Sequence, residues 1–487
     1  MLFNSFQFLI FFPVVTILYF LLPHKFRWFL LLSASCFFYM YFIPIYILIL
    51  FFTIIIDYIA GIYLEDTIDP RRKKLYLACS LVANIGVLAV FKYYNFFLDN
   101  LNTSSMAIFG HYVPFHYLSI LLPIGLSFHT FQAMSYTFEV YYGRQKAERH
   151  FGIYALYVMF YPQLVAGPIE RPQNVLPQLK QPHSFEYGNV RDGLIMMLWG
   201  LFKKVVIADN LSVYVNTAFT HPDDKTGMTL LIASYFFAFQ IYCDFSGYSD
   251  IAVGAAKVMG INLMENFRTP YVSQSIREFW GRWHISLSSW FRDYLYIPLG
   301  GNRVTKLRWM FNLFFVFMIS GVWHGANWTY VVWGSLHGLY LIIGILKDDF
   351  MEKKKWTLNA IAPWITRSIN ILVTFHLALF AWIFFRANSM HDASTVIHKI
   401  IHINWNLQSL NKSLVVLVSN PNNLGRIIFH ILLLLAFIFG DPIIERIVKK
   451  KTELRSSTLK MLLYACILAA IIIFGYFGEV QFIYFQF

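Results

Sequence analysis

The 487-residue sequence contains little charge for its length. Only 13% of its residues are Asp, Glu, Lys or Arg, whereas a soluble globular domain carries about 25%. Fifty Phe and thirty Tyr residues help to raise the hydrophobic content to 58%. A soluble core of this size cannot hide so many aromatic rings, but lipid solvates them readily. The composition therefore argues against an ordinary soluble enzyme and predicts an integral membrane protein.

Several chemical signatures are missing as well. The sequence has no P-loop, no dinucleotide-binding glycine pattern and no nucleophile elbow, so ATP hydrolysis and serine-type acyl transfer lack support. The four cysteines are scattered in apolar segments without metal-type spacing, and we expect small buried side chains instead of disulfides or a zinc site. They are Cys36, Cys79, Cys243 and Cys466. Met1–Leu22 has no basic residue and no small-residue cleavage site, which favours a retained span over a signal peptide.

The positive net charge of +13 has a membrane explanation. Lys and Arg lie in short clusters between apolar runs, such as Arg71–Lys74 and Lys449–Lys451. Basic clusters of this kind mark cytosolic loops under the positive-inside rule. We therefore expect the lipid bilayer as a partner and no nucleic acid.

The apolar runs between these clusters predict an all-α fold. A helix satisfies its own backbone groups in lipid, and about 20 residues cross the hydrocarbon layer. The length accommodates a polytopic bundle of about 11–13 spans in one transmembrane domain, residues 1–487, with a catalytic core at about residues 120–346. Prolines interrupt residues 151–190, and Phe160–Pro172 is a candidate re-entrant or pocket-lining segment. An interfacial helix is expected near Arg277–Phe291.

His324 is the main candidate for chemistry. It lies between two apolar runs, where a titratable side chain is costly unless it has a function. On a helix, Ser320 and Trp328 would share its face, and Gly321 and Gly325 would clear space for another backbone or a ligand. One interpretation is a general base that takes a proton from an acceptor hydroxyl. The other is a histidine that hydrogen-bonds neighbouring helices together.

His284 is the second candidate. Trp280, His284, Leu287 and Phe291 recur at helical spacing, which predicts an amphipathic surface helix that lines a pocket mouth or simply anchors in lipid headgroups. The acids Asp244, Asp250 and Glu170 stand in apolar surroundings and could contact substrate or form ion pairs with Arg171, Arg277 or Arg282. His129 is predicted to be a core histidine. The outer histidines His391, His398 and His402 have poor spacing for a metal site, and we expect none.

Several segments carry a resemblance to a known family. Trp323-His324-Gly325, Arg282–Leu287 and Asp244–Asp250 resemble the membrane-bound O-acyltransferase family. Pro298–Arg303 and Ala166–Pro172 are typical of its bacterial alginate O-acetyltransferase branch, and the closing Phe482–Phe487 is similar to that branch too. The D-alanyl transferase branch shares the two-histidine pattern but lacks the Gly-Gly-Asn-Arg ending. His129 stands where the family has an aromatic residue.

The resemblance implies a transfer reaction with assigned roles. His324 matches the catalytic histidine and His284 the second pocket histidine, which would position or polarise the acyl carbonyl. We expect Trp323, Arg282, Asp244 and Ser320 to contact substrate. The donor would be acetyl-CoA or another cytosolic thioester, with no bound cofactor. The acetyl group would cross the bacterial plasma (inner) membrane, where a separate periplasmic or extracellular acetyltransferase passes it to a polysaccharide.

Two other functions stay open. A D-alanyl transferase acting on teichoic acid would use the same two histidines. A non-enzymatic transporter or flippase would move an acylated or lipid-linked sugar without making a bond. The sequence also leaves alginate-like polymers, peptidoglycan and other exopolysaccharides open as acceptors.

Overall fold

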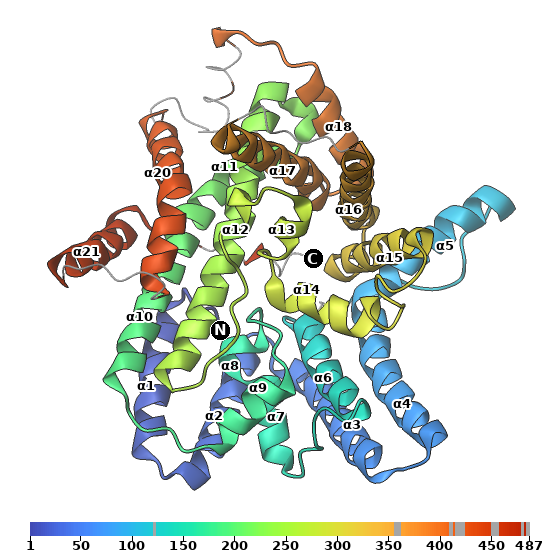
Figure 1. The fold of residues 1–487 in the computed structure, drawn as a ribbon, viewed down its shortest axis with the longest axis vertical. Helices are drawn as coiled ribbons and strands as arrows, with labels where there is room; N and C mark the ends of the chain where they lie inside the picture. Colours follow the sequence, from blue (N-terminus) through green and yellow to red (C-terminus); the bar gives the residue numbers. More distant parts are fainter. Residues whose placement is uncertain are drawn as a thin grey trace. The chain divides into compact units, whose positions relative to one another are not determined.

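The computed structural model describes residues 1–119, 123–354, 362–408, 413, 424–449, 457–478 and 482–483. Within these ranges all regular structure is helical (Figure 1), so the predicted all-α class is confirmed. Three parts of the sequence predictions lie outside the described residues. They are residues 120–122 of the expected core, Lys450 and Lys451 of the basic cluster, and Tyr484–Phe487 of the terminal motif.

The helices form two compact units. The first unit comprises Met1–Met197 and Ile251–Met264, and the second comprises Leu198–Asp250 and Glu265–Phe487. Two of the cuts fall within helices, α10 (Tyr187–Leu201) and α12 (Gly227–Val258), and the third follows Met264 in the connection after α12. The predicted organisation as one transmembrane domain stays a prediction.

The first unit is built from the N-terminal helices. They are α1 (Phe6–Leu21), α2 (His24–Met40), η1 (Pro44–Tyr46), α3 (Ile47–Asp66), α4 (Pro70–Leu88), η2 (Ala89–Tyr93), α5 (Tyr94–Phe109), α6 (Leu126–Tyr141), α7 (Phe151–Met159), α8 (Tyr161–Leu164), α9 (Pro172–Lys180) and the first part of α10 (Tyr187–Leu201). Local chemistry sets these boundaries. Asp69 caps α4 by accepting a hydrogen bond from the Arg71 amide, and Pro70 occupies the first turn, where no amide hydrogen is needed.

Polar side chains hold α3 and α4 together in the core of the first unit. Asn84 Nδ2 donates to both carboxylate oxygens of Asp57 at 3.0 and 2.8 Å, and Ser80 Oγ donates to the same carboxylate at 2.6 Å. All three residues are fully buried. Buried polar groups stabilise a helix pair when they are hydrogen-bonded, and the Asp57 carboxylate here accepts three such bonds from α4.

The proline-rich segment is irregular and buried, as predicted. Helix α8 has only four residues, and no helix runs between it and α9. Every residue from Phe160 to Glu170 is nevertheless buried. The Glu170 carboxylate accepts hydrogen bonds from the Met264 amide and from Asn174 Nδ2, so the irregular backbone is fixed by polar contacts.

The second unit holds the remaining helices. They are the end of α10, η3 (Phe202–Ala208), α11 (Asp209–Phe219), η4 (Pro222–Asp224), α12 (Gly227–Val258), η5 (Pro270–Val272), α13 (Ile276–Trp280), α14 (Ile285–Phe291), η6 (Arg292–Tyr296), α15 (Lys306–His324), α16 (Trp328–Lys353), α17 (Pro363–Arg386), α18 (Met390–Ile401), α20 (Leu424–Val448) and α21 (Ser457–Phe474). The four turns of this unit named η differ from an α-helix: η4 and η5 are tighter 3₁₀ turns, and η3 and η6 are wider π-helices, a geometry that often accompanies functional sites.

Glycines bring α15 and α16 into close contact (Figure 1). A Cβ atom added to Gly321 would lie 2.2 Å from the Tyr330 carbonyl oxygen, and one added to Gly334 would lie 2.3 Å from the Phe317 carbonyl oxygen. Small residues at such crossings let two helix backbones approach closely in a membrane. The connection Gly325–Asn327 is short, so α15 and α16 form an antiparallel hairpin.

Within the described ranges, five helical stretches are long and apolar enough to cross a membrane. They are Pro44–Asp66, Pro70–Phe109, Gly227–Val258, Trp328–Lys353 and Pro363–Arg386, and shorter apolar helices cover Phe6–Leu21 and Thr458–Phe474. The chain is therefore a polytopic membrane protein. All four cysteines are free thiols, but the expectation that all are buried is wrong. Cys79 and Cys466 are exposed on apolar helices, where lipid can cover them as a protein core would.

Candidate active site

His324 is the last residue of α15. The helix ends there because Gly325 adopts an extended backbone with φ of −163°, and Asn327 caps the next helix by accepting a hydrogen bond from the Thr329 amide. Trp328 therefore belongs to α16, and the expectation that it shares a helical face with His324 is wrong. Ser320, one turn earlier, does share the helix. The C-terminal end of a helix favours positive charge, so this position stabilises a protonated imidazole.

Aromatic rings surround the His324 side chain, which is only 3% exposed. The centroid of its ring lies 4.9 Å from that of Trp323, 4.9 Å from that of Trp333 and 5.4 Å from that of Phe385. Each pair is close to perpendicular. Such rings fix the imidazole in one orientation and attract it when it carries a proton.

The glycines beside His324 clear space for protein and not for a ligand. A Cβ atom on Gly325 would lie 2.1 Å from the ring of Tyr330, and the backbone of the same residue fills the space beside Gly321. Of the two possibilities that the sequence offered, the approach of another backbone is the one observed. The result is a hairpin tip that holds His324 rigidly.

His284 lies between two short helices. The predicted continuous helix through Trp280 and Phe291 is wrong, because α13 ends at Trp280 and α14 begins at Ile285. His284 has a φ of +42°, a left-handed conformation that is uncommon for residues other than glycine. The Trp283 amide closes a turn by donating to the Phe279 carbonyl at 2.8 Å. Backbone strain of this kind persists where the surroundings enforce it, often at functional sites.

Asn266 holds the His284 imidazole. Asn266 Nδ2 donates to Ser249 Oγ at 3.1 Å, which leaves its Oδ1 to accept from His284 Nδ1 at 3.1 Å and from Ser286 Oγ at 2.9 Å. The proton of the neutral ring is therefore on Nδ1, and Nε2 carries the lone pair. Burial lowers the pKa of His284 to about 3, because the charged form loses its hydration. His284 is consequently neutral at physiological pH.

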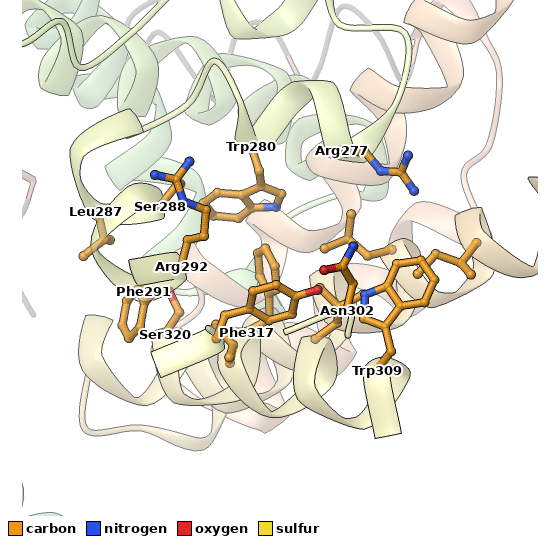
Figure 2. A pocket seen from close by; sticks show the side chains of 15 residues that line it. Arg277, Trp280, Leu287, Ser288, Phe291, Arg292, Asn302, Trp309, Phe317 and Ser320 are labelled. Atoms are coloured by element: carbon orange, nitrogen blue, oxygen red, sulfur yellow. The ribbon is translucent and has the colours of Figure 1, made fainter. Parts of the chain in front are cut away.

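A cavity of about 590 Å³ opens between α13, α14, η6, α15 and α16. Its walls are mostly apolar and aromatic, with two guanidinium groups and three hydroxyl groups among them (Figure 2). Trp280 and Arg277 point into it from one side, and Phe317, Trp309 and Ser320 from α15 face them. Further lining comes from Leu287, Ser288, Phe291, Arg292, Tyr296, Asn302, Leu313, Val316, Leu341 and Ile345. Because Ser320 lies one turn before His324, the cavity reaches the neighbourhood of the histidine.

The structure adds a histidine that sequence reasoning missed. His337 on α16 is fully buried, and Trp280 Nε1 donates to its Nδ1 at 3.2 Å. The ring of Trp333 contacts both histidines, with centroids 5.2 Å from that of His337 and 4.9 Å from that of His324. A sequence signal was available. Gly321–Gly325 and Gly334–Gly338 share the pattern Gly-x-x-His-Gly.

The contacts of Arg282 and Asp244 place both residues outside the cavity lined by Ser320. Arg282 pairs with Glu278 at 2.6 Å and lines a second, polar cavity. Asp244 pairs with Lys204 at 2.8 Å and accepts a hydrogen bond from the Ile483 amide at 2.8 Å. The expectation that arginines pair with Asp244 and Asp250 is wrong. Lys204 pairs with Asp244, and Lys203 pairs with Asp250 at 2.6 Å. The lysines come from the π-helix η3, which no sequence pattern had indicated.

A stack of indoles connects the two predicted catalytic histidines. Trp283, next to His284, contacts Trp382 at 5.0 Å between ring centroids, and Trp382 stacks on Trp333 at 5.7 Å. Trp333 then contacts His324. Among the residues that the structure describes, no group of three His, Cys, Asp or Glu side chains could hold a metal ion. The site therefore offers an imidazole, a shielded apolar cavity and hydroxyl and guanidinium groups.

Comparison with known proteins gives a consistent picture. Residues 148–386 match the model of the membrane-bound O-acyltransferase family. The chain is 38% identical to a probable alginate O-acetylase of Pseudomonas aeruginosa over 413 residues, which cover 84% of this chain and 76% of the relative. It is 36% identical to a peptidoglycan O-acetyltransferase of Helicobacter pylori over 400 residues, or 77% and 73% of the two chains. A teichoic acid D-alanyltransferase of Bacillus subtilis is 29% identical over 291 residues, or 58% and 72%.

Proposed function

The chain belongs to the membrane-bound O-acyltransferase family, and from this premise we propose that it moves an acetyl group from a cytosolic thioester across the membrane for O-acetylation of an exported or cell-wall polysaccharide. The chain is an O-acyltransferase. What we propose is the acyl donor, the direction in which the acetyl group crosses the membrane and the class of the acceptor. One observation carries it. His324 sits at the tip of a hairpin, one turn after Ser320, which lines a large and mostly apolar cavity.

The proposed reaction uses His324 as a general base. The oxygen of an acceptor hydroxyl attacks the carbonyl carbon of the thioester while His324 takes the hydroxyl proton. The carbon–sulfur bond then breaks, and the departing thiolate takes that proton from the imidazolium. The helix end and the aromatic rings around His324 stabilise the transient positive charge.

The cavity has features that suit a thioester donor. A thioester of coenzyme A has a long, uncharged arm that ends in phosphates, and apolar walls with Arg277 and Arg292 suit the two parts. Ser320 lines the cavity nearest to His324 and is proposed to contact the acyl end. Trp323, in ring contact with His324, is proposed to shape the same place.

His284, Arg282 and Asp244 are given supporting roles. His284 carries its proton on Nδ1, so its Nε2 has no hydrogen to donate to the acyl carbonyl, and of the two expected roles we keep that of positioning the substrate. Arg282 and Asp244, proposed to contact substrate from the sequence, have ion-pair partners that also suit a positioning role. We place the protein in the bacterial plasma membrane, with a separate periplasmic or extracellular acetyltransferase as the partner that receives the acetyl group.

The experiment compares cells that carry the wild-type chain with cells that carry His324→Ala at equal protein level. Ester-linked acetate on the surface polymers should fall to background in the variant. Unchanged acetate would rule the proposal out in favour of a transporter, since transport needs no base. A loss of ester-linked D-alanine instead would assign the second candidate, which the similarity to a teichoic acid D-alanyltransferase keeps in view.

A further inference from the structure

A polar cavity of about 440 Å³ lies in the second unit next to the segment that carries His284. Three arginines and three glutamates surround it: Arg268, Arg282, Arg446, Glu265, Glu278 and Glu445. The glutamates are engaged by basic groups. Arg268 pairs with Glu265 at 2.5 Å and Arg282 with Glu278 at 2.6 Å, while Lys449 contacts both Glu265 and Glu445.

The arginine side chains that line this cavity favour an anion. Arg268, Arg282 and Lys449 engage the three glutamates, and Arg446 adds a further guanidinium group to the wall. Arg446 is exposed at the end of α20. A guanidinium is suited to phosphate, because its donors match two oxygens at once.

An apolar groove of about 390 Å³ adjoins the polar cavity. It runs between α12, α17 and α20, and aromatic and aliphatic side chains such as Phe239, Phe375 and Leu435 line it. Helices α12 and α17 belong to the stretches long enough to cross a membrane. A groove on such helices is open to lipid chains.

The two hollows are continuous. Thr269 and Pro442 line both of them. Along α20, the groove uses Leu434 to Pro442 and the cavity uses Pro442 to Arg446. At 1.5 Å per residue, this stretch is about 18 Å long, close to the roughly 15 Å thickness of one leaflet of the hydrocarbon layer. Its polar end is the end followed by the basic residues Lys449–Lys451, as expected for the cytosolic side.

We propose that this combined hollow binds one anionic phospholipid, with the phosphate among Arg268, Arg282 and Arg446 and an acyl chain in the groove along α20. Neither part alone identifies the ligand. An anion pocket that opens into an apolar groove, the two together about as long as one leaflet is thick, has the chemistry of an anionic phospholipid at the cytosolic side. The site is distinct from the cavity beside Ser320; Arg282 is the residue it shares with the acyl-transfer proposal, and the test variants leave Arg282 unchanged.

The test measures lipid binding to the purified full-length chain by native mass spectrometry, with phosphatidylglycerol as the probe and phosphatidylcholine as the comparison. Wild type should retain one phosphatidylglycerol at low lipid concentration. Arg446→Gln should weaken this binding about tenfold, which corresponds to one lost charge-assisted contact of about 1.4 kcal/mol. Leu435→Trp, which fills the groove from an exposed position, should weaken it to a similar degree.

Two controls match these variants. Arg72→Gln removes an exposed arginine from α4, and Leu432→Trp adds an indole to α20 outside the groove. Both should bind phosphatidylglycerol as wild type does. Equal binding by all five chains would overturn the proposal, as would equal affinity for the two lipids. If millimolar inorganic phosphate displaces the lipid from wild type and still binds Leu435→Trp, the hollow is a phosphate site and the lipid assignment is wrong. The groove variant keeps the test valid if Arg446→Gln does not fold.

Discussion

His129 in the first unit and His324 in the second are both buried in apolar helices, with 1% and 3% of their surface exposed. Their surroundings differ. His129 Nε2 donates to Thr53 Oγ1 at 2.7 Å, and that hydroxyl donates onward to the Leu50 carbonyl. The cavity beside His129 is about 10 Å³, room for one water at most. The cavity that begins one turn from His324 is about 590 Å³.

This contrast shows what separates a structural histidine from a candidate base. Burial is the same for both, so burial alone carries no functional information. His129 joins α6 to α3 through a short hydrogen-bonded chain, as the Asp57 cluster joins α3 to α4. His324 lies instead at a helix end among aromatic rings, with space for a substrate nearby. Variants of the residues around the two histidines, and of the histidines themselves, test this difference.

The largest effect is expected from removing the imidazole itself. His324→Ala should lower acyl transfer by about 10²–10⁴-fold, the usual contribution of a general base. His129→Ala should leave turnover per folded molecule within about twofold and should cost stability, because it leaves Thr53 without its donor. Turnover and thermal midpoint of both purified variants check this. Equal losses of turnover in the two variants would remove the distinction between the two histidines.

The next effect concerns the glycine contact that builds the hairpin tip. Gly321→Ala places a methyl group 2.2 Å from the Tyr330 carbonyl oxygen, and we expect a loss of about 1–3 kcal/mol in unfolding free energy from overpacking. Gly86→Ala on α4 meets nothing within 4 Å and should be neutral or stabilising by up to about 1 kcal/mol. Thermal unfolding in the same detergent compares them. Similar midpoints would show that the close approach of α15 and α16 is not required.

A smaller effect is expected at the pair Trp280 and His337. His337→Leu and Trp280→Phe each remove one side of the same hydrogen bond and should raise the Michaelis constant for the donor by about tenfold, because Trp280 forms part of the cavity wall. The double variant should be no worse than either single one. His337→Asn keeps an acceptor near the position of Nδ1 and should restore much of the loss. Additive losses, or no rescue by asparagine, would show that His337 only fills space.

The smallest effect is a pH dependence of stability at His284. Its pKa is about 3 in the folded protein and 6.5 in the unfolded chain, so the unfolded chain takes up a proton first as the pH falls. The contribution of the neutral His284 to the free energy of unfolding is fully present above the unfolded pKa of 6.5. It is lost progressively as the pH falls, by about 1 kcal/mol between pH 7 and pH 5.5.

Replacing the imidazole should remove this slope. His284→Asn should reduce the dependence of the thermal midpoint on pH over that window by the contribution of one group, whereas replacing the exposed His391 by Asn is the matched control. An unchanged slope in His284→Asn would show that the charged form of His284 is tolerated in the folded protein.

The sequence predicted the features that depend on local chemistry. Low charge and long apolar runs indicated an all-α membrane protein, and prolines indicated the irregular segment around Glu170. His324 stood out because it interrupts an apolar stretch. These predictions use only residue type and neighbours in the chain.

Other features depend on residues far apart in sequence. The break between α13 and α14 is fixed by Asn266, whose Oδ1 contacts His284 and Ser286. The partner of Asp244 is Lys204, 40 positions earlier, on a π-helix that has no sequence signature. His337 differs, since its Gly-x-x-His-Gly pattern was visible beside that of His324. Its importance became clear only when Trp333 was seen in contact with both rings.

The central claim is that His324 performs acyl transfer, and the most direct test uses purified chain in lipid nanodiscs. Acetyl-CoA labelled in the acetyl group is supplied from solution, and release of free coenzyme A together with transfer of label to a hydroxyl acceptor is followed over time. Wild type and His129→Ala should consume the thioester at similar rates per folded molecule, and His324→Ala should be at background. Consumption by His324→Ala at the wild-type rate would contradict the account.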